Sequence, residues 1–280
     1  MDTSKVWYVT GASQGLGLTL VKKLLNNGYR VAATSRNAQA LKDAVGLIDT
    51  KRFLPLAVDL NNPESIEESI RQTITAFERI DVVVNNAGYG MAGVIEEIEE
   101  QKMQDIINLN LIATINVTKQ VLPVMRAQGS GYFINIGSVA GFAGAPGWSI
   151  YSATKAAVAA FSEVLSLDVK EFGIKVTVVE PAGFRTGFLT DGSLANIESK
   201  INGYEAVKKT QRNYLAMNGR QAGDPEKAAA IFIGLAEDPE PPLHLFLGAD
   251  AYNRASAKLA SMLSELEMWK AVTLSADFEG

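Results

Sequence analysis

Short apolar runs alternate with amphipathic stretches along most of the chain. The apolar runs predict strands over residues 5–9, 29–34, 53–58, 81–84, 132–136, 175–179 and 243–247. The stretches between them predict helices over residues 15–26, 38–47, 62–78, 100–125, 150–172 and 225–236. Strands that alternate with helices favour a parallel sheet with helices on both faces. The predicted fold class is α/β, a doubly wound parallel sheet of about seven strands that binds ligands beyond the carboxyl ends of its strands.

Two segments depart from this alternation. Residues 183–223 are rich in loop-forming residues, and an insertion of this length in a compact domain predicts a lid or binding segment. In the tail, residues 253–280, Leu259, Met262, Leu263 and Leu266 recur at helical spacing. The tail is predicted to be an amphipathic helix that packs on the body of the protein or on a sister subunit. Nothing in the length requires a second domain, so one domain over residues 1–280 is expected.

Composition narrows the classes of function. The net charge is −5, and the 26 lysines and arginines are scattered, which argues against a nucleic-acid surface and favours small-molecule partners. With no cysteine and one histidine, the chain cannot form disulfides, thiolate metal sites or multi-histidine zinc sites. Residues 1–9 lack a signal-peptide pattern, so a cytoplasmic location is expected. The uncharged stretch 127–154 is too glycine-rich and polar for a membrane helix and is interpreted as the wall of a buried cleft.

Glycines join the first predicted strand to the first predicted helix. Gly11, Gly15 and Gly17 follow the spacing Gly-x-x-x-Gly-x-Gly. Glycines let a backbone approach a pyrophosphate closely, and a helix start offers free N–H groups to phosphates. Such a turn can also be purely structural, but at this position in a strand–helix–strand unit it predicts dinucleotide binding.

Tyr151 and Lys155 lie four residues apart in the predicted helix 150–172 and therefore share one face. A positive charge beside a phenol favours the phenolate, so the pair is suited to proton transfer near neutral pH. Ser138 precedes them within the same uncharged stretch. A tyrosine followed four residues later by a lysine or arginine arises by chance about once in a chain of this composition, so its meaning depends on the other motifs.

Five motifs coincide in this chain. They are the glycine turn, Asn85-Asn86-Ala87-Gly88 after the fourth predicted strand, Ser138, the Tyr151/Lys155 pair and a turn at Pro181. In order and separation they resemble the short-chain dehydrogenase/reductase family over about residues 5–190. The resemblance implies a Rossmann fold and hydride transfer between NAD(P) and a carbonyl or alcohol. Residues 30–36 and 179–186 look like the branch that contains hydroxysteroid and retinol dehydrogenases.

The resemblance also implies a role for each catalytic residue. Tyr151 protonates the carbonyl oxygen as hydride arrives, or deprotonates the alcohol in the reverse direction. Lys155 lowers the pKa of that phenol and binds the nicotinamide ribose, while Ser138 holds the carbonyl oxygen. Asn110 matches the asparagine that completes a water-linked proton relay in the family. Taken alone, an asparagine in a helix is usually only a polar face residue.

Cofactor choice depends on the end of the second predicted strand. NAD-dependent enzymes carry an acidic residue there, about 20 residues beyond the glycines, and residues 34–37 contain none. Arg36 and Ser35 suit the 2′-phosphate of NADP(H), which is favoured, with NAD(H) as the alternative. Gln14 stands where NADP-dependent relatives often carry a second basic residue. No metal is required. The cofactor contacts implied by the resemblance are Gly11, Ser13, Gln14, Gly15, Leu16, Gly17, Ser35, Arg36, Asp59, Leu60, Asn86, Ala87, Gly88, Tyr151, Lys155, Pro181, Gly183, Phe184 and Thr186.

The residues expected around the substrate are mostly apolar, which predicts an apolar ketone, aldehyde or secondary alcohol. They are Tyr89, Met91, Ala140, Phe142, Trp148, Phe184, Phe188 and Leu189. Two other functions stay open: a dehydratase or epimerase that uses the same Tyr/Lys pair, and a regulator that senses NADP(H) without turnover. A homo-oligomer, either a dimer or a tetramer, is expected.

Other conspicuous residues are interpreted as structural. His244 adjoins the last apolar run and has no polar neighbour in the sequence that suggests a site. An acidic run near a helix start is interpreted as solvated surface rather than a metal site. Its members are Glu96, Glu97, Glu99 and Glu100.

Overall fold

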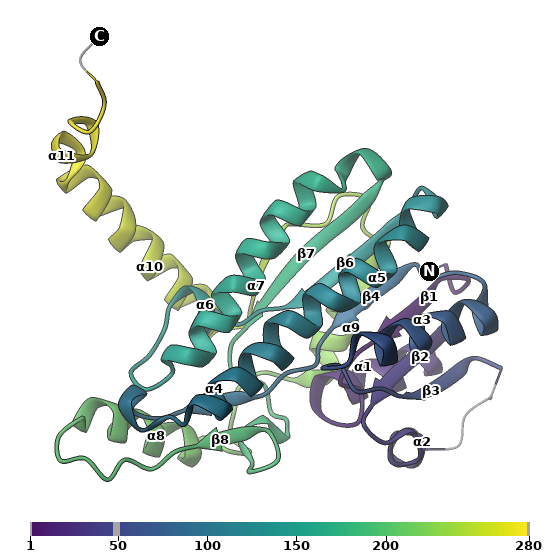
Figure 1. Ribbon diagram of the computed structural model, residues 1–280, viewed down its shortest axis with the longest axis horizontal. Helices are drawn as coiled ribbons and strands as arrows, with labels where there is room; N and C mark the ends of the chain where they lie inside the picture. Colours follow the sequence, from purple (N-terminus) through teal and green to yellow (C-terminus); the bar gives the residue numbers. More distant parts are fainter. Residues whose placement is uncertain (1, 47–50, 279–280) are drawn as a thin grey trace.

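The computed structural model describes residues 2–46 and 51–278, and Figure 1 shows the arrangement of its helices and strands. In this part of the chain the main sheet has seven parallel strands, in the spatial order β3-β2-β1-β4-β6-β7-β9. Their bounds are β1 (Val6–Val9), β2 (Arg30–Ser35), β3 (Phe53–Ala57), β4 (Val82–Asn85), β6 (Gly131–Ile136), β7 (Ile174–Pro181) and β9 (His244–Leu247). The order reverses between β1 and β4, the point at which such sheets bind ligands. The predicted Rossmann-type α/β fold is confirmed.

Two layers of helices cover the sheet. One face is covered by α1 (Gly15–Asn26), α2 (Ala38–Val45) and α9 (Pro225–Glu237). The opposite face is covered by α3 (Pro63–Phe77), α5 (Ala113–Gln128) and α7 (Ser149–Asp168). Successive strand residues point to opposite faces, so Trp7 and Val9 pack under the first layer while Val6 and Tyr8 pack under the second. This double burial explains why the strands are apolar at nearly every position. Leu47, the predicted end of the second helix, lies outside the described residues.

Local capping fixes where α3 begins. The Asn62 side chain accepts hydrogen bonds from the backbone N–H groups of Glu64 and Ser65, at 2.9 and 3.4 Å. Pro63 occupies the first helical position, where a missing N–H has no consequence, and Glu64 lies in the positive first turn. The predicted helix start is therefore confirmed by the cap that the sequence encodes.

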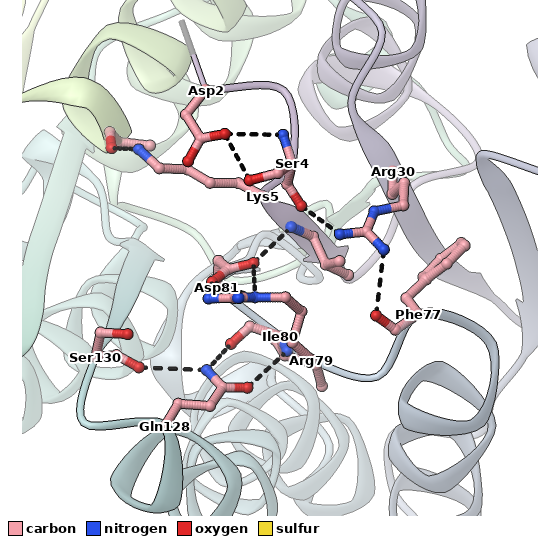
Figure 2. Close-up of polar contacts among 12 residues, drawn as sticks. Asp2, Ser4, Lys5, Arg30, Phe77, Arg79, Ile80, Asp81, Gln128 and Ser130 are labelled. Carbon is pink, nitrogen blue, oxygen red and sulfur yellow. Dashed lines mark hydrogen bonds and ion pairs between the residues drawn. The ribbon is translucent and has the colours of Figure 1, made fainter.

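A polar network joins the amino ends of the strands (Figure 2). Asp81 accepts a hydrogen bond from the Val6 N–H at 2.8 Å and pairs with the Arg79 guanidinium at 2.6 Å. The Gln128 amide bonds the N–H and the carbonyl of Ile80, at 3.1 and 2.8 Å. Backbone groups at this edge are thus satisfied within the protein. The network ties β1 and β4 to α5 at the edge opposite the expected ligand site.

The helix predicted over residues 100–125 is interrupted. α4 (Glu100–Ile107) and α5 are separated by a π-helical turn over Asn108–Ile112. Such a turn holds an extra residue and is frequent at functional sites. Here it carries Asn110 to a buried position, where 1 % of the residue is exposed. The prediction of a continuous α-helix is wrong at this point, because the spacing of apolar residues does not reveal the one extra residue that a π-helical turn contains.

Residues 183–223, which the sequence predicts to be a lid and which are called the lid segment below, have more regular structure than their composition predicts. The segment contains a 3₁₀ turn (Gly187–Leu189), strand β8 (Leu194–Asn196) and helix α8 (Glu205–Ala216). β8 pairs in parallel with β5 (Gly90–Ala92), a second small sheet that the sequence did not predict. Gln211 is the one buried residue of α8, so this helix lacks the apolar stripe that would have predicted it.

The tail begins earlier than predicted and leaves the body of the protein. It forms α10 (Ala249–Met268) and α11 (Lys270–Leu274). Ala251 and Ala255 are buried close to β9 and α6 (Val139–Phe142). Beyond them the helix projects into solvent, as the yellow ribbon of Figure 1 shows. The alternative in which this helix packs along the body of its own chain is therefore wrong. Across the described ranges, we find no helix with the length and hydrophobicity that a membrane span requires.

Candidate active site

A cleft of about 950 Å³ opens at the carboxyl ends of the central strands. This volume lies at the upper end of the range for small-molecule sites. The glycine turn, the end of β2 and the lid all contribute to its walls. Every residue predicted to be catalytic or to contact the cofactor lines the cleft except Gly17 and Asn110.

Glycine is required at two points of the turn between β1 and α1. Gly11 has a φ of +63°, and a Cβ there would lie 2.7 Å from the Cα of Ala87. A Cβ on Gly17 would lie 2.5 Å from the Asn86 side-chain nitrogen. That nitrogen donates to the carbonyls of Thr10 and Gly11, both at 3.0 Å. The end of β4 therefore holds the turn in place, and the N-terminus of α1, with its free N–H groups, opens onto the cleft.

The end of β2 supplies a cation to the same half of the cleft. Arg36 is exposed on the cleft wall and makes no hydrogen bond or ion pair with the described residues. Its guanidinium is therefore available to an anionic ligand. The Ser35 hydroxyl already donates to the carbonyl of Asn37 at 2.7 Å, so any bond from Ser35 to a phosphate competes with this contact. Asp59 is exposed on the wall, and its carboxylate accepts from the N–H of Asn61 at 3.0 Å.

Ser138, Tyr151 and Lys155 line the cleft together, and each is less than a tenth exposed. Ser138 begins α6, where its hydroxyl accepts from the N–H of Ala140 at 3.1 Å. Tyr151 and Lys155 lie one turn apart at the start of α7, and the ammonium is 5.9 Å from the centre of the phenol ring. Lys155 donates to the carbonyl of Ile136 at the end of β6, at 2.7 Å. This bond holds the ammonium at the carboxyl ends of the strands, where sheets of this type bind ligands.

Burial governs the ionisation of this group. It raises the pKa of Tyr151 to about 12, against a smaller lowering by the hydrogen bond with Ser138. Burial also lowers the pKa of Lys155 to about 8. The expected lowering of the phenol pKa by Lys155 is therefore wrong here, because desolvation outweighs an ammonium that lies 5.9 Å from the ring centre. At neutral pH the phenol holds its proton and the lysine holds its charge.

Asn110 lies behind the cleft wall and is hydrogen-bonded to residues on both sides of it. Its side-chain oxygen accepts from the N–H of Tyr89 at 3.0 Å, and its nitrogen donates to the Tyr89 carbonyl at 3.0 Å and to the Thr154 hydroxyl at 3.2 Å. A Cβ on Gly88 would lie 2.8 Å from the same oxygen, so glycine is needed there as well. The residue joins the wall after β4 to the helix that carries Tyr151. Its place in a proton relay stays a prediction.

Aromatic side chains surround Tyr151. The Trp148 ring lies 5.4 Å from the Tyr151 ring and 4.7 Å from the Tyr214 ring of α8, between ring centres. Phe188 lies 6.0 Å from Tyr151 in the same way. Of the residues predicted to surround the substrate, six line the cleft: Tyr89, Ala140, Trp148, Phe184, Phe188 and Leu189.

Two predicted substrate residues lie elsewhere. Met91 is 1 % exposed and packs in a small core beneath the lid. Phe142 packs on Phe246 of β9, with 5.2 Å between ring centres. Both are therefore corrected to packing residues. Their apolar character suited a cleft or a core equally well, and only the fold separates the two.

The turn after β7 leads into the lid and joins it to the rest of the cleft. The N–H of Ala182 bonds the carbonyl of Leu247, so β9 supports this turn. The hydroxyl of Thr186 accepts from the N–H of Phe188 at 3.3 Å and begins the 3₁₀ turn. Gln14, at the start of α1, donates to the Ser193 hydroxyl at 2.7 Å. The glycine turn and the lid are therefore in direct contact.

The residues interpreted as structural have partners far away in the sequence. The two ring nitrogens of His244 lie 3.0 Å from Glu180 and 3.3 Å from Glu163, which links β9, β7 and α7 outside the cleft. Glu96 accepts from the Tyr204 hydroxyl and Glu97 from the N–H of Lys200, so these two residues anchor the lid instead of facing solvent alone. In the described part of the chain, no cluster of three or more acidic or histidine side chains is arranged to hold a metal ion.

The family profile described as short chain dehydrogenase matches residues 5–195. The chain belongs to the short-chain dehydrogenase family. Within it, the oxidoreductase BOA17 of Botryotinia fuckeliana is 35 % identical over 274 residues, 98 % of this chain and 99 % of that protein. The 3-ketodihydrosphingosine reductase of Bacteroides thetaiotaomicron is 32 % identical over 240 residues, which are 86 % of this chain and 86 % of that protein. This short-chain dehydrogenase is therefore an oxidoreductase by family.

Solved structures agree with this assignment. The crystal structure of a short-chain dehydrogenase from Streptomyces avermitilis is 36 % identical and matches 98 % of this chain and 99 % of its own, with a TM-score of 0.90. A 3-ketoacyl-(acyl-carrier-protein) reductase from Brucella melitensis, solved with NADH, has a TM-score of 0.71 over 86 % of this chain and 95 % of its own. At 20 % identity, that second similarity shows the fold alone.

The short-chain dehydrogenase profile ends at residue 195, whereas the cleft includes residues from α8 and α10. Sequence reasoning missed these: Thr210, Asn213, Tyr214, Met217, Asp250 and Arg254. Arg254 donates to the carbonyl of Ala143, directly after α6, and lies 3.5 Å from Asp250. The start of α10 thereby clamps the end of the short helix that Ser138 begins.

We expect Arg254→Ala to raise the KM for the carbonyl substrate about fivefold and to leave the dinucleotide Kd unchanged. The reason is the loss of one hydrogen bond to the wall at Ala143, which contributes about 1 kcal/mol. Steady-state kinetics and dinucleotide titration measure the two quantities. Lys258→Ala, one turn further along α10 and outside the cleft, is the matched control. An unchanged KM in Arg254→Ala contradicts a role for α10 in shaping this wall.

Proposed function

We propose that this short-chain dehydrogenase transfers a hydride between NADP(H) and an apolar carbonyl or secondary alcohol, with Tyr151 as general acid and base. The observation that supports this most directly is the buried group of Ser138, Tyr151 and Lys155 on one cleft wall. Because burial raises its pKa to about 12, the Tyr151 phenol keeps its proton at neutral pH. A protonated phenol is what the reduction of a carbonyl requires.

The cleft suits a dinucleotide by its own geometry. Close packing around Gly11 and Gly17 leaves bare backbone beside the N-terminus of α1, which is the environment that a pyrophosphate requires. Arg36 offers its guanidinium to the 2′-phosphate, with Ser35 beside it. A bound NADP(H) supplies or accepts the hydride. In this proposal Asp59 and Leu60 contact the adenine, Asn86, Ala87 and Gly88 border the adenosine ribose, and the segment of Pro181, Gly183, Phe184 and Thr186 borders the carboxamide.

The chain's own residues handle the oxygen and the proton. Ser138 donates a hydrogen bond to the carbonyl oxygen and orients it toward Tyr151. The Tyr151 hydroxyl then donates its proton to that oxygen as negative charge develops. Lys155, fixed by its bond to Ile136, stabilises the phenolate that is left and holds the nicotinamide ribose. Asn110 completes the path by which water returns the proton, from its position between Tyr89 and Thr154.

The substrate half of the cleft supports an apolar compound. Trp148 and Phe188 lie against the Tyr151 ring, and Tyr214 lies against Trp148, so this half of the cleft presents aromatic surface. One relative, named as a 3-ketodihydrosphingosine reductase, is named for a ketone substrate, which agrees with this class. The more specific assignment to the hydroxysteroid and retinol branch has no support from the relatives found and stays a prediction.

We also propose that residues 183–223 act as a substrate lid. Gln14 contacts Ser193 on the cleft wall, and Glu97 accepts from the N–H of Lys200, so this segment is held to the body at two points. Met217 and Tyr214 of the same segment line the cleft. A cytoplasmic location stays a prediction.

A panel of apolar ketones, aldehydes and secondary alcohols with both cofactors tests the function. Stoichiometric oxidation of NADPH with a ketone or aldehyde is the expected result, followed by the absorbance of the reduced nicotinamide. Turnover without net oxidation identifies a dehydratase or epimerase, and binding without turnover identifies a regulator. If only polyanionic compounds react, the proposed apolar class is wrong.

Arg36→Asp is expected to lower the ratio of kcat/KM with NADPH to kcat/KM with NADH by about 10- to 100-fold. A charge-assisted bond to a phosphate contributes about 1.5 to 3 kcal/mol, and the new carboxylate repels the phosphate while suiting a ribose diol. Kinetics with each cofactor at a fixed substrate concentration give the ratio. Lys42→Asp makes the same charge change on an exposed position of α2 outside the cleft and controls for it. A ratio that Arg36→Asp leaves unchanged shows that Arg36 does not select the cofactor.

A further inference from the structure

The C-terminal helix carries an apolar stripe that the rest of the described chain does not cover. Leu259, Met262, Leu263 and Leu266 are 48 to 62 % exposed. They follow one another at intervals of three and four residues, so they form a single stripe along α10. Figure 1 shows that this part of α10 extends away from the sheet and its helices. The stripe is therefore accessible along its whole length.

Most of α10 has no packing partner in the described part of the chain. Helical segments in water gain most of their stability from packing an apolar face. Only the first turns of α10 pack on the body, through Ala251 and Ala255. The structure of the Streptomyces relative matches 98 % of this chain at a TM-score of 0.90, which leaves room for only a few unmatched residues. The aligned region of that crystal structure therefore extends into the tail.

Charges beside the stripe identify the partner. Lys258 and Glu265 are seven residues apart, so they lie on the same flank of the stripe, and the midpoint between them falls next to Met262. Two antiparallel helices that lie side by side are related by a two-fold axis perpendicular to the plane that contains both helices. This axis brings the same flank of each copy to the same side of the pair. With the axis near Met262, each Lys258 faces Glu265 of the other copy, while the leucines of the two stripes meet. The apolar centre and the charge centre coincide, so the surface is complementary to itself.

We propose that α10 pairs in antiparallel orientation with α10 of a second copy of this chain, around an axis near Met262. The charges of the tail support this partner over a lipid surface. Residues 249–280 contain three cations and five anions, whereas helices that lie on membranes are rich in lysine and arginine. They are Arg254, Lys258, Lys270, Asp250, Glu265, Glu267, Asp277 and Glu279. The proposal does not depend on the substrate or the cofactor.

Single engineered cysteines test the pairing in the full-length protein, because the chain has none of its own. Met262→Cys is expected to form a disulfide-linked dimer under mild oxidation, since its two copies meet at the axis. Tyr252→Cys is the matched control: it is exposed on the same helix, and the antiparallel arrangement separates its two copies by about 30 Å. Equal cross-linking of Tyr252→Cys indicates a parallel pair and overturns the proposal. Absence of cross-linking in Met262→Cys overturns it as well.

A charge exchange gives a second test. Lys258→Glu and Glu265→Lys each place like charges opposite each other, and each is expected to weaken this association about threefold to tenfold. The double variant Lys258→Glu/Glu265→Lys restores opposite charges and is expected to return close to the wild-type dissociation constant. Sedimentation equilibrium measures it at low salt, where surface pairs are least screened. If the double variant is no better than the single variants, or if the wild type stays monomeric and binds phosphatidylcholine vesicles instead, the pairing is wrong.

Discussion

Tyr151→Phe is expected to lower kcat/KM for carbonyl reduction by about 10²- to 10⁴-fold and to leave the dinucleotide Kd nearly unchanged. The substitution removes the hydroxyl that donates the proton, a step whose loss typically has an effect of this size. It keeps the ring that packs against Trp148 and Phe188, so the shape of the cleft is preserved. Absorbance of the reduced nicotinamide gives the rate, and fluorescence titration gives the dinucleotide Kd.

Tyr132→Phe is a matched control for this loss. Tyr132 is buried, its hydroxyl bonds Thr177 at 2.6 Å, and burial raises its pKa to about 12, as for Tyr151. It lies in β6 outside the cleft, so removing its hydroxyl is expected to affect stability and not turnover. If Tyr151→Phe retains full activity, or if both variants lose activity equally, Tyr151 is not the general acid.

Lys155→Met is expected to lower kcat/KM about 10²- to 10³-fold, because it removes the positive charge that stabilises the phenolate. It is also expected to leave the folded state at least as stable at neutral pH. The pKa of Lys155 is about 8 rather than 10.5, so holding the ammonium in this site costs about 3 kcal/mol. The variant removes this cost and leaves the Ile136 carbonyl unpaired, which costs about 1 to 3 kcal/mol. Kinetics and thermal unfolding measure the two effects.

The pH dependence of Lys155 has a defined sign. In the wild type, the destabilisation by the buried ammonium is fully present below pH 8 and is relieved as the pH rises toward 10.5, because the unfolded chain holds this proton longer. The difference in Tm between Lys155→Met and the wild type should therefore shrink over this interval. Carbonyl reduction by the wild type should fall as the pH rises through about 8. Lys42→Met, at an exposed position, should keep the wild-type pH profile of turnover and should not change the dependence of Tm on pH. A reduction rate that stays flat to pH 10 contradicts the assigned role.

Local motifs in the sequence were informative about the glycine turn and the Tyr151/Lys155 pair. Gly11 and Gly17 are needed because backbone and side chains approach them within 3 Å, a constraint that leaves a visible trace in the sequence. Tyr151 and Lys155 are one helical turn apart, so their spacing alone places them on one face. Such features depend on neighbours along the chain or on residue identity, and they were predicted correctly.

Contacts between segments that are distant in the chain could not be predicted from local patterns in the sequence. Asn110 reaches Tyr89 and Thr154 only because one π-helical turn redirects it, and Arg254 reaches Ala143 from the far end of the chain. The pKa of Tyr151 was predicted to fall because the sequence shows the nearby charge and not the depth of burial. Met91 and Phe142 are apolar residues near the site that the fold places in packing roles.

By itself the sequence determined the doubly wound α/β fold and the glycine turn, and it predicted the group of Ser138, Tyr151 and Lys155. Periodicity and residue type specify these because they follow from backbone geometry and side-chain chemistry over short distances. Only the tertiary structure decided the protonation state of Tyr151, the clamp from Arg254 and the exposure of the α10 stripe. Those properties depend on how deeply each group is buried, and burial is decided by packing between residues that are far apart in the chain.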